Sequence, residues 1–88
     1  MSFQLSLITP EGRIFEDTVE SLAAPGLLGG FEVYSGHACF LAALKEGKLR
    51  VRKGGREQVF TTGSGVLEVS SDHNVLALVD SASSQSTG

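Results

Sequence analysis

Apolar and polar residues alternate along much of this chain with the two-residue period of half-buried β-strands. Near the N-terminus, Phe3, Leu5 and Leu7 alternate with the polar residues Ser2, Gln4 and Ser6. The sequence Thr9-Pro10-Glu11-Gly12 then fits a type I turn, because proline pre-sets the φ angle of the second turn position and glycine suits the fourth. Residues 3–16 are therefore predicted to form a β-hairpin.

Short extended segments, each bounded by glycine, proline or polar residues, follow one another after this hairpin. The expected strands lie at residues 19–24, 31–34, 48–52, 59–60, 66–69 and 75–79. The sequence Lys53-Gly54-Gly55-Arg56 predicts a two-residue hairpin turn, because both glycines accept a positive φ angle. The apolar residues 38–44 are too few for periodicity to distinguish a strand from a helix.

About eight to ten short strands in roughly 80 residues predict an all-β fold, a flattened antiparallel β-sandwich or barrel. No segment has a sustained helical stripe. The length suits one domain, which we expect at residues 1–80. Residues 81–88 are rich in serine and lack a large apolar side chain. Ordering each residue costs about 1–2 kcal/mol, so this segment is predicted to be a flexible tail.

Composition excludes several classes of protein. The 88 residues have a net charge of −3 and a pI of about 5.2, and this argues against general nucleic-acid binding, which needs a basic excess. The single cysteine, Cys39, cannot form an internal disulfide and is expected to be a small buried apolar residue. We find no apolar run of the roughly 20 residues that cross a bilayer and no pattern of a secretory signal.

Charge is distributed in three bands. Residues 1–44 have a net charge of −4, residues 45–56 have a net charge of +5 from six bases and one acid, and residues 57–88 again have −4. The basic band fits a solvated strand face that pairs with its acidic neighbours. It also fits a docking edge for an acidic partner, and the sequence leaves both interpretations open.

Residue patterns for catalysis or metal binding are weak. Ser64, Asp72 and His73 are the residue types of a hydrolase triad, but adjacent Asp72 and His73 in one turn cannot orient each other. His37, Cys39 and His73 lack both the close spacing of a structural zinc site and a fourth ligand. We therefore expect no catalytic residue, no cofactor and no metal.

Glycines cluster around two adjacent leucines, Leu27 and Leu28. The glycines are Gly26, Gly29, Gly30 and Gly36. One interpretation is a turn that requires positive φ angles. The other is a loop that approaches a partner closely with the two leucines as apolar anchors. His37 is correspondingly either a hydrogen-bonding residue at the start of a strand or an interface contact.

Several pieces of the chain together resemble a known family. They are Leu5-x-Leu7-Ile8-Thr9-Pro10-Glu11-Gly12, Pro25-Gly26-x-x-Gly29-x-Phe31-x-Val33-Tyr34-x-Gly36-His37-Ala38, Leu44-x-x-Gly47-x-Leu49, Glu68-Val69 and Asn74-Val75. Over residues 3–80 the chain resembles the N-terminal β-sandwich of the epsilon subunit of F-type ATP synthase, which is called delta in mitochondria.

The resemblance implies a non-catalytic subunit of the central stalk, or rotor. Such a subunit docks on the gamma subunit and on the polar loops of the c-ring, and it helps to couple proton translocation to ATP synthesis. It has no cofactor, binds no nucleic acid and is peripheral to the membrane through the complex, without direct insertion. The implied location is the cytoplasmic face of the bacterial inner membrane, with a plastid or another energy-transducing membrane left open.

The resemblance also implies two groups of interface residues. The residues that match the c-ring contact are Gly26, Leu27, Leu28, Gly29, Gly30 and Phe31. The residues that match the contact with gamma and the ring are Ser35, Gly36, His37, Ala38 and Phe40. Ser35 and Cys39 replace prolines that are usual in the family, and Gly30 replaces a residue that is commonly polar.

The C-terminal helical hairpin of the family has no counterpart in the 88 residues. That hairpin is associated with inhibition of ATP hydrolysis and, in some members, with ATP binding, so neither activity is expected here. A different class of function remains as the alternative: a stand-alone ligand- or peptide-binding β-domain that uses the loop from Pro25 to His37.

Overall fold

The computed structural model describes residues 2–36, 38–70 and 74–85, which form ten strands and no helix. The strands are β1 (Phe3–Thr9), β2 (Gly12–Val19), β3 (Ser21–Ala24), β4 (Phe31–Tyr34), β5 (Phe40–Leu44), β6 (Gly47–Lys53), β7 (Arg56–Thr62), β8 (Gly65–Val69), β9 (Asn74–Val79) and β10 (Ala82–Gln85). The predicted all-β fold is thus confirmed, and the undecided residues 38–44 contain a strand. Within the described ranges there is no helix that could cross a membrane.

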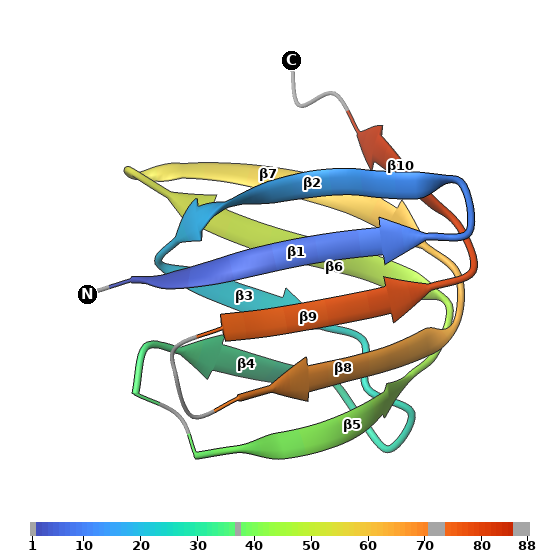
Figure 1. Ribbon diagram of the computed structural model, residues 1–88, viewed down its shortest axis with the longest axis horizontal. Helices are drawn as coiled ribbons and strands as arrows, with labels where there is room; N and C mark the ends of the chain where they lie inside the picture. Colours follow the sequence, from blue (N-terminus) through green and yellow to red (C-terminus); the bar gives the residue numbers. More distant parts are fainter. Residues whose placement is uncertain (1, 37, 71–73, 86–88) are drawn as a thin grey trace.

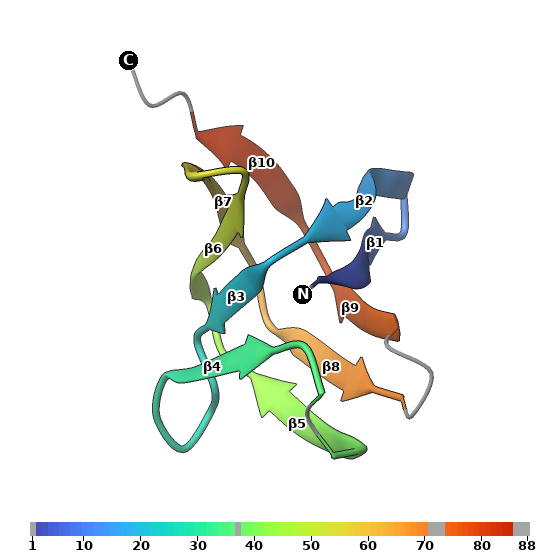
Figure 2. The same cartoon turned by 90° about the vertical axis from the view of Figure 1, so that its left-hand side faces the viewer.

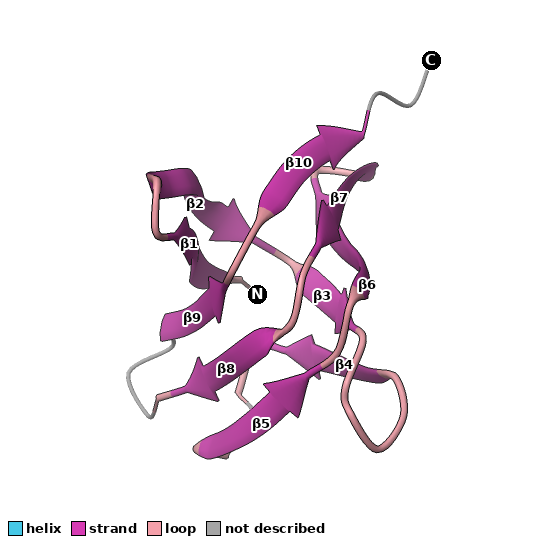
Figure 3. Ribbon diagram, turned by 90° about the vertical axis from the view of Figure 1, so that its right-hand side faces the viewer, coloured by secondary structure: helices cyan, strands magenta, loops and turns pink. Residues whose placement is uncertain are grey.

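The ten strands form two sheets that pack face to face (Figures 1 and 3). Sheet A has the order β2-β1-β9-β8-β5, and sheet B has the order β10-β7-β6-β3-β4. The two packed sheets confirm the predicted β-sandwich, whose principal extents are 28, 27 and 25 Å. Strands of four to eight residues are short enough that each sheet is about as long as the sandwich is thick.

Both predicted turns connect neighbouring strands. In the turn between β1 and β2, the backbone N–H of Glu11 donates to Thr9 Oγ1 at 3.1 Å, and Gly12 has a φ of 125°. Between β6 and β7, Gly54 and Gly55 have φ angles of 57° and 78°. Two positive φ angles are the geometry of a type I′ hairpin.

Two features of the topology were not predicted. The chain passes from sheet A to sheet B through the single residue Glu20, so that β2 continues almost directly into β3 (Figure 2). The pair β1 and β9 is parallel, whereas every other strand pair is antiparallel. Hydrophobic alternation indicates which face of a strand is buried but not which strand lies beside it. For this reason neither feature could be predicted from the sequence.

Large apolar side chains from both sheets fill the core. Leu5, Leu7 and Leu67 come from sheet A, and Leu22, Leu49 and Phe60 come from sheet B. Fully burying a side chain of this size contributes about 1.5–3 kcal/mol. The core therefore fixes the backbones of the two sheets, and their outer faces and connecting loops remain for interactions.

The expected flexible tail is wrong for residues 82–85, which form β10. This strand pairs with β7 from Ala82 opposite Thr62 to Gln85 opposite Val59, and the N–H of Gly63 donates to the carbonyl of Ser81 at 3.0 Å. The backbone of β10 pairs with the N–H and C=O groups along the edge of β7, and Ala82 packs against the core. These backbone hydrogen bonds offset the entropy lost when the segment becomes ordered. The prediction of a flexible tail considered only the lack of large apolar side chains and so did not include them.

Candidate interaction surface

The loop between β3 and β4 is held in place by backbone hydrogen bonds to the strand β5 and to Lys45, the residue that follows it. The N–H of Leu27 donates to the carbonyl of Ala43, and the N–H of Lys45 donates to the carbonyl of Pro25, both at 2.9 Å. Gly26 also forms a bridge with Leu44. The loop thus joins the edge of sheet B to the edge of sheet A, and its shape is fixed although its tip is exposed.

Different constraints apply to the glycines of the cluster, three of which lie in this loop while Gly36 follows β4. A Cβ atom on Gly26 would lie 2.4 Å from the carbonyl oxygen of Gly29 and 2.9 Å from ring carbons of Phe31. Gly29 and Gly36 have positive φ angles of 136° and 88°, which side chains disfavour. Gly30 has neither restriction, since a Cβ would lie 3.7 Å from the carbonyl oxygen of Ala24, an ordinary contact distance. The positive φ angles at Gly29 and Gly36 fit the interpretation of a turn, and Gly26 allows a close approach within the loop itself. Contact of the loop with a partner stays a prediction.

The two leucines project from the loop. Leu27 is 60% exposed, and Leu28 is fully exposed. Nearby Leu41 on β5 is 70% exposed. The loop and β5 enclose a mainly apolar hollow of about 350 Å³. Its lining residues are Gly26, Leu27, Leu28, Gly29, Phe31, Leu41, Ala42 and Ala43.

The second predicted group of residues begins at the end of β4 and continues to β5. Ser35 is half-buried, whereas Gly36 and Ala38 are exposed. His37 lies outside the described residues. The rings of Phe40 and Phe31 meet edge to face with centroids 5.8 Å apart, so one aromatic contact joins the two predicted groups.

Cys39 is exposed, so the expectation that it is buried is wrong. The apolar run suggested that Cys39 lies inside a strand, but β5 begins only at Phe40. Cys39 therefore belongs to the connection that precedes an edge strand, where neither sheet covers it.

The outer face of sheet A extends the apolar surface, and the sequence analysis missed it. The strand registers place Ala43, Val66, Leu78 and Ile8 side by side across β5, β8, β9 and β1. Val66 and Leu78 are 38% and 42% exposed. Because Leu27 bonds to the backbone of Ala43, this row is continuous with the loop.

A signal for this outer face is present in the sequence. The strand β9 contains five consecutive apolar residues, 75–79, in place of a strict alternation. Such a run is typical of a strand that is covered on both faces. In the described structure only the inner face of β9 is covered, by the core residues Val75, Ala77 and Val79.

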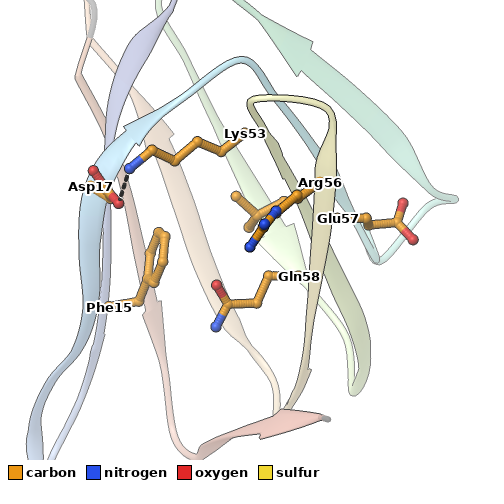
Figure 4. A pocket seen from close by; sticks show the side chains of 7 residues that line it. Phe15, Asp17, Lys53, Arg56, Glu57 and Gln58 are labelled. Atoms are coloured by element: carbon orange, nitrogen blue, oxygen red, sulfur yellow. Dashed lines mark hydrogen bonds and ion pairs between the residues drawn. The ribbon is translucent and has the colours of Figure 1, made fainter. Parts of the chain in front are cut away.

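A cleft of about 310 Å³ lies between the sheets, between β2 and the β6–β7 hairpin (Figure 4). Asp17 of β2 and Lys53 of β6 form an ion pair across it, so this pair ties sheet A to sheet B. The hydrogen bond that Lys53 donates, and then the N–H of Thr18, lower the pKa of Asp17 from its ordinary value of 3.8. Each charge of the pair is compensated by the other. We therefore interpret the pair as a structural contact between the two sheets.

The comparisons with known sequences identify a family. The family described as ATP synthase, Delta/Epsilon chain, beta-sandwich domain, matches residues 2–85. An ATP synthase epsilon chain of Anaeromyxobacter sp. (strain K) is 40% identical over 82 residues, which are 93% of this chain and 61% of the relative. The chain thus spans about three-fifths of that relative's length. An ATP synthase epsilon chain of Chlorobaculum tepidum is 42% identical over 85% of this chain and 86% of its own length.

Solved structures show the same fold at lower sequence identity. A chain in the Euglena gracilis mitochondrial ATP synthase (OSCP/F1/c-ring) superposes with a TM-score of 0.89 at 21% identity, over 94% of this chain and 53% of that chain. A chain in the central stalk/c-ring of the Tetrahymena thermophila mitochondrial ATP synthase gives 0.79 at 16% identity, over 91% and 64%. The sequence matches and the common sandwich agree, and the chain belongs to the ATP synthase delta/epsilon family through its beta-sandwich domain.

Proposed function

We propose that this chain is a non-catalytic subunit of the central stalk of an ATP synthase. It docks on the gamma subunit and on the c-ring and helps to couple proton translocation to ATP synthesis. It is peripheral to the membrane through the complex. The observation that carries the proposal is the continuous apolar surface of the loop and sheet A in a chain that belongs to the delta/epsilon family.

We assign the exposed loop tip to the c-ring. Leu27 and Leu28 expose apolar side chains on a backbone that the bonds to β5 already fix, so little conformational entropy is lost when a partner binds. Ser35, Gly36, His37, Ala38 and Phe40 are assigned to the contact with gamma and the ring. The outer face of sheet A, with Leu41, Val66 and Leu78, extends the contact with gamma.

A pull-down with the cognate gamma subunit tests this assignment. The intact chain is expected to form a stable one-to-one complex. Leu41→Asp and Val66→Asp place a charge on the proposed contact and are expected to weaken binding at least about tenfold, the effect of losing an interface anchor. Ile14→Asp is the matched control, because Ile14 is 39% exposed on β2, at the opposite edge of sheet A from β5. No binding by the intact chain would contradict the proposal.

The apolar hollow supports a second candidate, a ligand- or peptide-binding domain that uses the loop from Pro25 to His37. A hollow of about 350 Å³ is at the lower end of small-molecule sites. A thermal-shift screen in which a small apolar ligand stabilises the wild type but not Ala42→Leu would favour this candidate. A screen without hits would count against the ligand-binding candidate and in favour of the stalk assignment.

A further inference from the structure

The outer face of sheet B has a row of bases on its middle strand. In β6 the core residues Leu49 and Val51 point inward, so the alternating Lys48, Arg50 and Arg52 point outward. These three bases belong to the basic band of the sequence, and the fold places them on the face opposite to the apolar surface of sheet A.

Small side chains lie directly beside this row. On β3, Ser21 is opposite Arg52 and Ala23 is opposite Arg50. On the far side of β3, β4 places Tyr34 opposite Ser21 and Glu32 opposite Ala23. Long side chains on both neighbouring strands thus rise above a floor of small side chains.

The result is a trough that follows β3. It consists of two hollows of about 360 and 340 Å³, which share Ala23, Glu32 and Arg50. We call it the basic trough and define it by Ser21, Ala23, Glu32, Tyr34, Lys48, Arg50 and Arg52. One end reaches Gly30 and Phe31, so the trough opens beside the loop tip.

The two arginines of the trough are only weakly engaged by the described residues. Arg50 is 3.5 Å from Glu57, and both side chains are exposed by more than 40%, a kind of pair that contributes little stability. The Tyr34 hydroxyl donates to Glu32, whose carboxylate raises the pKa of Tyr34. Arg52 makes no ion pair with any residue in the described ranges.

The spacing of the bases points to the shape of a ligand. Side chains on one face of a strand repeat every two residues, about 6.6–6.8 Å, and an extended peptide has the same repeat. We propose that the basic trough binds an extended acidic segment of a partner protein, whose acidic side chains alternate with small residues. Each acidic side chain faces one base of β6, and the backbone of the segment lies over Ser21 and Ala23. The inference goes beyond the stalk assignment and does not depend on it.

An anionic membrane surface fits this face less well. A flat array of headgroups would meet Glu32 and Glu57 along with the bases, and the small floor residues would remain out of its reach. A narrow acidic segment instead fits between the walls and can follow the bases.

The test measures binding of the whole chain to two labelled peptides by fluorescence anisotropy at low salt. One peptide is Gly-Asp-Thr-Asp-Thr-Asp-Gly, and the other has the same composition with the three Asp residues adjacent. The alternating peptide is expected to bind about tenfold more tightly. Arg50→Ala or Arg52→Ala is expected to weaken its binding about tenfold, as for loss of one charge-assisted hydrogen bond.

Two further variants separate shape from charge. Ala23→Leu fills the floor of the trough without changing any charge and is expected to abolish the preference for the alternating peptide. Arg13→Ala is the matched control, because Arg13 is also an exposed, ion-paired arginine but lies on sheet A; it is expected to change nothing. Thermal melting of each variant checks that it is folded.

Four results would overturn the proposal. Equal binding of both peptides, or an equal effect of Arg13→Ala and Arg50→Ala, would show non-specific charge attraction. Binding to phosphatidylglycerol vesicles that is lost in Arg50→Ala, with no peptide binding, would make the face a lipid contact. Self-association that is lost in Arg52→Ala, with no peptide binding, would make it a contact between two copies of the chain.

Discussion

The shape of the loop between β3 and β4 depends on Gly26, and a single added methyl group tests this dependence. In Gly26→Ala the new Cβ would lie 2.4 Å from the carbonyl oxygen of Gly29 and 2.9 Å from Phe31. Both distances are far below van der Waals contact, and the oxygen belongs to the backbone, so the loop must move. The movement strains the two 2.9 Å hydrogen bonds that connect the loop to β5.

The expected loss of stability follows from overpacking. Forcing an extra methyl group into a well-packed site costs about 1–3 kcal/mol. For a domain of this size, each kcal/mol corresponds to a shift in Tm of about 4–8 °C. Gly26→Ala is therefore expected to lower the free energy of unfolding by about 1–3 kcal/mol and the Tm by at least about 4 °C, in urea and thermal denaturation followed by circular dichroism.

Gly30→Ala is the matched control in the same loop. Its φ angle is not positive, and its Cβ would be 3.7 Å from the carbonyl oxygen of Ala24, an ordinary contact. This substitution also reduces the entropy of the unfolded chain, so its stability is expected to be unchanged or higher by up to about 1 kcal/mol. If the two variants were equally stable within about 0.5 kcal/mol, the close approach at Gly26 would not control the loop.

Three further predictions concern the core, pH and regulation. Leu67→Ala removes a fully buried side chain and is expected to cost about 2–5 kcal/mol in urea unfolding; a loss below 1 kcal/mol would refute this packing. The pKa of Asp17 is depressed in the folded state, so its pair with Lys53 contributes stability above pH 3.8, and this contribution is lost as the pH falls further through the folded pKa. Unfolding between pH 2 and 5 should therefore depend less on pH in Asp17→Asn, and an unchanged profile would contradict the ion pair. The 88-residue chain is expected to leave ATP hydrolysis by the cognate F1 complex uninhibited in a coupled ATPase assay, and clear inhibition would place an inhibitory element within these residues.

Local sequence predicted most of the strands because their signals are local. The alternation at Phe3, Leu5 and Leu7 gave one buried face, and Gly54-Gly55 gave a turn with two positive φ angles. The parallel pairing of β1 with β9 and the strand β10 arise from backbone hydrogen bonds between distant segments. No pattern of side chains in a short window encodes such pairings.

The candidate surface was predicted only in part for the same reason. Leu27 and Leu28 are exposed as expected, because glycines on both sides leave them on a loop. The row that includes Val66 and Leu78 forms only when four strands come together in register. The division of the basic band between the basic trough and the Asp17–Lys53 pair likewise depends on which face each β6 residue occupies.

Photocrosslinking inside the assembled enzyme tests whether the chain docks on the c-ring and on gamma through the proposed surface. A benzoylphenylalanine residue at position 28 reports on the loop tip, one at position 66 reports on the outer face of sheet A, and one at position 13 serves as an exposed control on β2. We expect crosslinks from position 28 to the c-ring and from position 66 to gamma, with neither product from position 13. Assembled enzyme in which positions 28 and 66 give no crosslink to the ring or to gamma would contradict the proposed docking surface.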